Sequence, residues 1–113
     1  MKRVGKREDE ELQKKSIWLA QTVAAGAYGV QMDDMCSRTR KGEAEKARQL
    51  AAYLARVVFD VGLRELAIAM GRSPGTVCHA CRRVEQRREE PQFDFAVEYL
   101  EHQLRSAATG AAA

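Results

Sequence analysis

Apolar side chains recur at helical spacing through long windows of this chain, and only two prolines, Pro74 and Pro91, interrupt them. Apolar residues three or four positions apart line one face of an α-helix, whereas a half-buried strand alternates apolar and polar residues. No segment of the sequence shows that alternation. The spacing therefore predicts an all-α fold, a compact helical bundle, and 113 residues suit a single domain with one core.

The two ends of the chain differ in composition from the part between them. The first twelve residues are charged and carry no apolar stripe, and the alanine-rich end has little to bury. We therefore expect a flexible N-terminus at 1–12, a folded domain at 13–106 and a disordered tail at 107–113.

Several features bear on the compartment of the protein. No apolar run has the length of a membrane span. Acidic residues at 8–11 occupy the place where an export signal would carry its apolar core, and three cysteines, an odd number, indicate reduced thiols. We expect a cytoplasmic protein, associated with the nucleoid if it binds DNA, with no membrane partner.

Glycines and prolines divide the apolar pattern into segments. We place Leu12 and Val57 on apolar faces, and we expect Trp18, Tyr28 and Tyr53 in the core or at its edge. The segments expected to be helical are 12–27, a short turn at 33–36, 44–60 with Gly62 as its stop, 63–70 closed by Gly71, 74–90, and 93–104.

The most specific local signal is the sequence Gly71-Arg-Ser-Pro-Gly-Thr76 between two of these helices. Ser73 is a favoured N-cap residue, and Pro74 suits the first helical position, where the amide hydrogen that it lacks would be unpaired. A short helix, a tight turn with glycine and a capped second helix form the helix-turn-helix pattern, whose second helix enters the major groove of duplex DNA. The residues expected at bases are Ser73, Pro74, Gly75, Thr76 and His79, and those expected at phosphates are Arg72, Arg82, Arg83 and Arg48, whereas Val77 and Val84 fall on the inward stripe of the second helix.

The charges are segregated along the chain, although the net charge is only +3. Residues 38–48 hold five basic and two acidic side chains, 72–88 hold five basic and one acidic, and 89–101 hold five acidic side chains and no lysine or arginine. Basic clusters of this kind supply phosphate contacts and release counterions on binding. The side chains that we assign to the basic loop are Arg38, Arg40, Lys41 and Lys46.

The sequence contains Lys46-Ala-Arg-Gln-Leu-Ala-Ala-Tyr-Leu54, Leu63-Arg-Glu-Leu-Ala67, Gly71-Arg72 and Thr76-Val-Cys-His-Ala-Cys-Arg-Arg-Val-Glu85. These four stretches resemble the DNA-binding domain IV of the bacterial replication initiator DnaA. The resemblance covers roughly 17–104, and it implies a Trp-repressor-like bundle with its helix-turn-helix in the major groove and a basic side chain in the adjacent minor groove. It places Thr76 and Val77 at bases and thymine methyl groups, Arg72 at DNA, and Lys46 at the minor-groove position.

The sequence departs from that family where the family reads its target. Ser73, Pro74 and Gly75 stand in place of an Asp-His-Thr triplet, and these side chains cannot make the same hydrogen bonds. Because each base contact contributes about 1–3 kcal/mol of discrimination, we expect DNA binding to remain and the target sequence to differ.

Nothing in the sequence predicts catalysis. No phosphate-binding Gly-x-x-x-x-Gly-Lys-Ser/Thr loop occurs, and no nucleophile, base and carboxylate set can be assembled, so we expect no enzyme activity, no small-molecule substrate and no cofactor. Cys78, His79 and Cys81 form a C-x-x-C pair with an inserted histidine, but Cys81 lies on the apolar stripe, and we expect no metal site.

Three functions follow from these observations. The first is a sequence-specific duplex-DNA binder that regulates transcription, with the transcription machinery or another regulatory protein as a further partner; similar stand-alone DnaA-like domains resemble activators of phage-derived or gene-transfer-agent genes. The second is a replication-control protein that competes with DnaA at origin sites. The third is a protein-interaction module that does not bind DNA.

Overall fold

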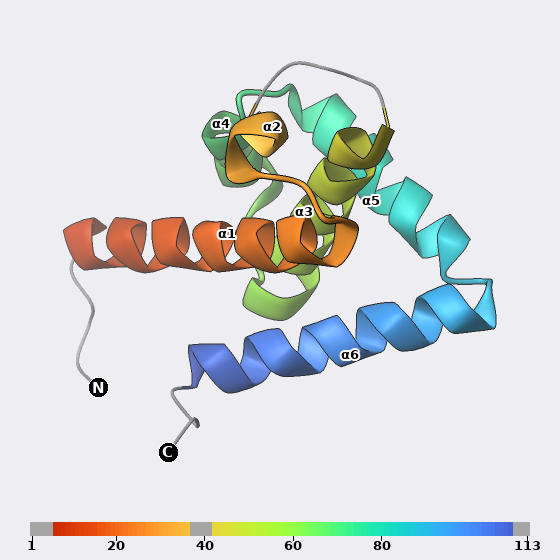
Figure 1. The fold of residues 1–113 in the computed structure, drawn as a ribbon. Coiled ribbons are helices and arrows are strands. Elements are labelled where there is room, and N and C mark those ends of the chain that lie inside the picture. The colour runs from red at the N-terminus through yellow and green to blue at the C-terminus, as the bar shows by residue number, and fades with distance from the viewer. Residues whose placement is uncertain (1–5, 37–41, 110–113) are drawn as a thin grey trace.

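The computed structural model describes residues 6–36 and 42–109, and it contains helices and no strand within these ranges. The expected all-α fold is thereby confirmed. The helices surround α3, with α1 across it, α4 and α5 above, and α6 below (Figure 1). Their bounds are α1 Lys6–Tyr28, α2 Met32–Cys36, α3 Gly42–Phe59, α4 Leu63–Met70, α5 Pro74–Arg87 and α6 Pro91–Ala108.

Helix α3 is the centre of the fold, and most of its length is buried. Its inward positions are rich in alanine, and so are those of α1, where Ala20 and Ala24 are fully buried. Small side chains let two helix backbones approach closely, and α1 packs extensively along α3. Larger side chains fill the rest of the core, among them Leu54, Leu66, Val84, Val97 and Leu104.

The end of α3 differs from the sequence expectation. Asp60, rather than Gly62, ends the helix by taking a left-handed conformation with φ of 54°. The N–H of Val61 then donates to the carbonyl of Ala55 at 3.2 Å, and the Val61 side chain enters the core. Aspartate tolerates this conformation better than most residues. Gly62 is instead the N-cap of α4.

Both ends of the folded domain extend further than expected. Helix α1 begins at Lys6, so residues 6–12 are helical, and α6 continues to Ala108.

Leu12 and Val57 are exposed, and Trp18 is 55% exposed, so its expected place in the core was wrong. Trp18 follows the buried Ile17, and one residue turns a helix by about 100°, which carries the indole away from the side of α1 that faces the core. Tyr53 is buried and Tyr28 half-buried, as expected.

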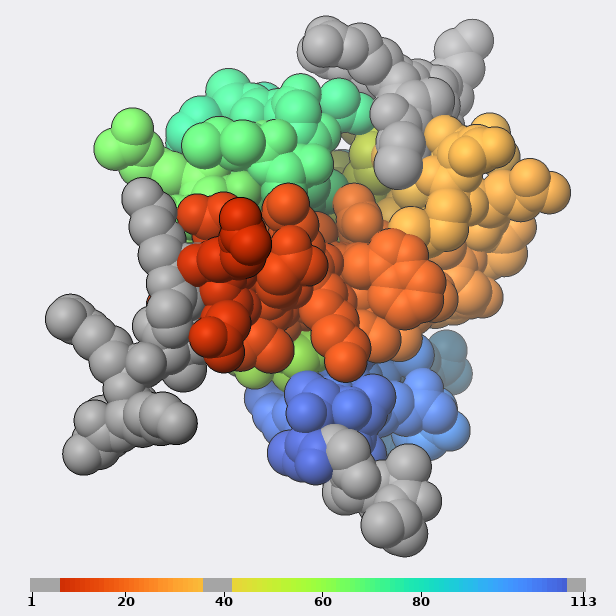
Figure 2. Space-filling model, turned by 90° about the vertical axis from the view of Figure 1, so that its left-hand side faces the viewer, coloured from red at the N-terminus to blue at the C-terminus, as the bar shows by residue number. Residues whose placement is uncertain are grey.

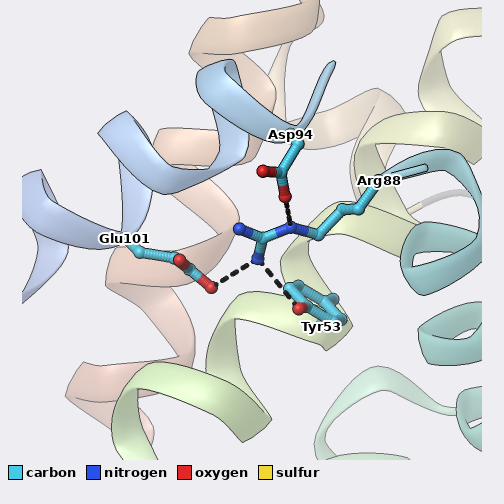
Figure 3. A network of polar contacts seen from close by, with 4 residues as sticks. All are labelled: Tyr53, Arg88, Asp94 and Glu101. Carbon is cyan, nitrogen blue, oxygen red and sulfur yellow. Dashed lines mark hydrogen bonds and ion pairs between the residues drawn. The ribbon is translucent and has the colours of Figure 1, made fainter. Parts of the chain in front are cut away.

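Arg88, which follows the last residue of α5, connects this helix to α6 and α3. The Arg88 guanidinium donates to Asp94 and, at 2.9 Å each, to the Tyr53 hydroxyl and the buried carboxylate of Glu101 (Figure 3). Burial acts to lower the pKa of Arg88, but these three hydrogen bonds outweigh it and raise that pKa. The acidic α6 is therefore held to the core by a partly buried charge network.

Helix α1 lies between the two ends of the molecule. In Figure 2 its red and orange surface separates the green surface of α4 and α5 from the blue surface of α6. None of the helices in the described ranges is long and apolar enough to cross a membrane.

We expect Arg88→Met to lower the free energy of unfolding by about 3 kcal/mol, because it leaves the buried Glu101 carboxylate without its partner. Urea denaturation of the variant measures the loss. The double variant Arg88→Met/Glu101→Leu should recover most of it, since no buried charge remains. As a control, Arg83→Met changes an exposed arginine and should stay within about 0.5 kcal/mol of the parent. Equal losses in the single and double variants would contradict this account.

Candidate nucleic-acid interface

Helices α4 and α5 are joined by a tight turn at Gly71. Gly71 has φ of 65°, a left-handed conformation that glycine adopts without strain, and its N–H and that of Arg72 donate to the carbonyls of Ile68 and Ala67. Three residues separate the helices, as in a helix-turn-helix. The predicted end of the first helix at Met70 and start of the second at Pro74 are confirmed, whereas α5 ends at Arg87 and not at Glu90 as expected.

The first turn of α5 is capped by Ser73. The Ser73 hydroxyl oxygen accepts a hydrogen bond from the Thr76 N–H at 3.1 Å, and the Val77 N–H donates to the Ser73 carbonyl. Within this first turn Pro74 has no N–H, and the N–H of Thr76 is capped by Ser73. The N–H of Gly75 is therefore the amide of the turn that is left without a helical acceptor. That amide lies at an exposed residue at the positive end of the helix dipole, where a phosphate oxygen is stabilised.

One side of α5 faces solvent and carries polar and basic groups. Thr76, His79 and Arg83 follow one another at intervals of three and four residues, which places them on one helix face, with Arg82 beside them. All four are exposed, as are Ser73, Pro74 and Gly75. The expected contact residues on α5 are therefore available to a ligand, with one exception.

Val77 is that exception, and the expectation that it contacts thymine methyl groups is corrected. It is 2% exposed and packs in the core with Val84, one heptad further along α5. These two valines anchor the helix, and burying them turns the Thr76–Arg83 side outward.

Arg48 is also placed differently from the expectation of a phosphate contact. It is 8% exposed, and its guanidinium donates to the backbone carbonyl of Asp34 at 3.2 Å, which ties α3 to α2. Burial lowers the pKa of Arg48, and the positive charge of Arg72 lowers it further. Arg48 is therefore a structural residue at the floor of the site.

Two further arginines of the basic stretch 72–88 are used inside the fold. Arg87 donates to the Tyr28 hydroxyl at 2.9 Å and stacks over the Phe93 ring, and Arg88 holds α6. The basic surface of the motif is thus narrower than the sequence count indicates, and it centres on Arg82 and Arg83.

A cleft of about 840 Å³ lies between α3 and the α4–α5 turn. Its α3 wall is formed by Glu45, Arg48, Gln49 and Ala52, which recur at helical spacing, and its other wall includes Arg72, Ser73, Thr76 and His79. Sequence reasoning missed Glu45 and Gln49. In the sequence these two residues are a polar pair beside the apolar stripe of α3. Such a pair faces solvent in any amphipathic helix, and it becomes part of a site only because α5 lies opposite in the folded chain.

Lys46 lies at the start of α3, exposed and 3.7 Å from Glu43 in an ion pair, and it does not line the cleft. A weak surface pair of this kind leaves the lysine available to DNA. The expected basic-loop residues Arg38, Arg40 and Lys41 lie outside the described residues.

The cysteine pair of α5 does not form part of a metal cluster within the described ranges. Cys78 and Cys81 are free thiols, and burial raises the pKa of Cys81 to about 11.

Comparison with known proteins agrees with this geometry. Residues 18–84 match the family described as "Bacterial dnaA protein helix-turn-helix". The chromosomal replication initiator protein DnaA of Thermodesulfovibrio yellowstonii is 32% identical over 78 residues, which are 68% of this chain and 18% of that protein. The chain thus spans less than a fifth of the length of this relative.

Two solved structures share the fold. One, titled as a crystal structure of a DNA replication initiation factor, matches with a TM-score of 0.82 and 30% identity over 90% of this chain and 32% of that chain. The other, titled as replication initiator DnaA bound to AMPPCP and single-stranded DNA, matches with a TM-score of 0.79 and 30% identity, over 90% of this chain and 31% of that one. The chain belongs to the bacterial DnaA helix-turn-helix family.

Proposed function

We propose that this protein binds double-stranded DNA at a specific sequence, with the first turn of α5 in the major groove, and that it regulates transcription by occupying that site. The observation that carries the proposal is the exposed first turn of α5, capped by Ser73 and flanked by Arg82 and Arg83. Helix-turn-helix proteins present this part of the second helix to base edges, and nearby arginines hold phosphates.

The exposed groups in the first turn of α5 determine which contacts with DNA bases are available. Pro74 and Gly75 offer no side-chain hydrogen bonds, and the Ser73 and Thr76 hydroxyls are hydrogen-bonded to each other, which leaves the Thr76 methyl group, His79 and backbone atoms to meet the bases. Apolar surface and a threonine methyl group suit thymine methyl groups. We therefore infer a target that differs from the site read by relatives with Asp-His-Thr at these positions.

A domain that recognises a DNA site can act by occupying that site or by recruiting another protein to it. No nucleotide-binding loop lies within the 113 residues. Regulation of transcription, including activation of phage-like or gene-transfer-agent genes, is one use of such a domain. Competition with DnaA at origin sites is the second candidate, and it is favoured by the identity with a chromosomal replication initiator.

Selection from a random duplex library should enrich one motif. Reversing both charges in Arg82→Glu/Arg83→Glu should weaken binding at least tenfold and reduce the slope of log affinity against log salt by about two, because two phosphate contacts are lost. The matched control Lys14→Glu/Lys15→Glu reverses two exposed charges on α1 and should keep the selected motif and most of the affinity. Equal binding to every duplex, or none at low salt, would refute the proposal.

Gly75→Ala should stabilise the fold and weaken DNA binding. A Cβ at Gly75 would lie 3.9 Å from the Ser73 hydroxyl oxygen, an ordinary contact, and alanine favours helix by about 0.5 kcal/mol or more. The methyl group would project toward the DNA, and obstructing one base-pair contact costs about tenfold in affinity. Gly26→Ala is the control, because a Cβ there meets nothing within 4 Å and the residue lies on α1. If Gly75→Ala bound DNA as tightly as the parent protein, the proposed close approach of DNA to the backbone at Gly75 would be contradicted.

Chromosomal occupancy decides between the candidate uses of the domain. Transcripts beside the occupied sites should change when the protein is replaced by Arg82→Glu/Arg83→Glu, if it regulates transcription. Occupancy confined to DnaA boxes would support the replication alternative instead. A phenotype that the double reversal leaves unchanged would support a protein-interaction module without DNA binding.

A further inference from the structure

The solvent face of α6 carries two large aromatic side chains that nothing in the described chain covers. Phe95 is 72% exposed and Tyr99 is 58% exposed, and they lie one turn apart. The opposite face of α6, with Val97 and Leu104, is buried in the core. Single exposed apolar residues are common, but two aromatics aligned on one helix face are typical of a contact surface.

These two residues lie on a line of heptad positions along α6, formed by residues 95, 99, 102 and 106, which we call the seam. Phe95, Tyr99, His102 and Ser106 follow one another at intervals of four, three and four, the spacing of alternating d and a positions in a coiled coil. All four are exposed, and the Gln103 amide donates to the Tyr99 hydroxyl at 2.9 Å, which restrains that ring before any partner arrives. The seam therefore has the spacing that a partner helix could pack along.

The charges beside the seam specify the partner. Glu98 and Arg105 both occupy the g position of the heptads and both are exposed. They are seven residues apart, about 10.5 Å along the helix, too far to pair with each other. In an antiparallel pair of α6 helices the g positions of the two chains face one another, so that Glu98 of one chain meets Arg105 of the other, twice.

We infer that α6 is a homodimerisation surface, in which a second copy of this chain packs antiparallel along the seam. Phe95 then lies against Ser106 of the other copy and Tyr99 against His102, in an isologous contact with two-fold symmetry. A parallel arrangement would instead set Glu98 opposite Gln103 and leave the charges unmatched.

The position of α6 keeps this surface separate from the DNA-binding motif. Helix α6 lies on the other side of α1 and α3 from the α4–α5 turn (Figures 1 and 2). A dimer formed along α6 therefore leaves both helix-turn-helix surfaces uncovered and joins two DNA-binding units in one particle. The inference does not depend on the proposed function, because association is measured without DNA.

A charge-swap cycle tests the antiparallel contact. Sedimentation of the purified protein over a concentration series should show a dimer, and Glu98→Arg or Arg105→Glu alone should raise its dissociation constant about three- to thirtyfold, since each places like charges opposite one another twice. The double variant Glu98→Arg/Arg105→Glu should restore association to within about threefold of the parent. Circular dichroism confirms that each variant stays helical.

An apolar pair of variants tests the seam itself. Phe95→Ser should raise the dissociation constant by more than about tenfold, whereas Ile68→Ser, an equally exposed apolar residue on α4, should leave it unchanged. The inference would be overturned if the parent protein stayed monomeric at concentrations up to about 1 mM, because even a weak dimer would form at that concentration. So would a double charge swap that fails to restore the dimer, or an Ile68→Ser variant as impaired as Phe95→Ser.

Discussion

The burial of Val77 and Val84 on one side of α5 is the constraint on which the candidate site depends. A helix held to a core by one face presents the opposite face, and here the opposite face carries Thr76, His79 and Arg83. The left-handed turn at Gly71 and the Ser73 cap then fix where α5 begins and which way its first amides point. DNA-binding chemistry thus follows from apolar packing underneath it.

Some arginines of this protein hold the fold together, and others are exposed on the helix-turn-helix. Arg48, Arg87 and Arg88 are held by hydrogen bonds to Asp34, Tyr28 and the acidic groups of α6, while Arg82 and Arg83 remain exposed. The acidic stretch 89–101 is therefore partly neutralised inside the fold, and the exposed face of α6 carries Phe95 and Tyr99 beside Glu98 and Arg105. One end of the molecule suits DNA and the other suits a second copy.

Much of this arrangement could be predicted from the sequence, because the signals were local. Gly71, Ser73 and Pro74 determine the helix boundaries of the motif through backbone conformation and capping, which depend on a few neighbouring residues. The exposed contact residues followed from helical spacing within α5. Trp18 and Arg48 were misplaced because burial depends on which face of a helix meets which neighbour, and those neighbours meet only in the folded chain. Val77 was assigned to bases by the family resemblance, although its helical spacing with Val84 already indicated burial.

The sequence by itself determined the helical class, the capped helix-turn-helix and the family resemblance, since periodicity and turn chemistry are properties of short segments. Only the tertiary structure decided which arginines are exposed, that Glu45 and Gln49 join the cleft, and that Phe95 and Tyr99 are left outside the core. The physical reason is that an apolar or basic side chain gains its role from what packs against it, and that partner lies far away along the chain.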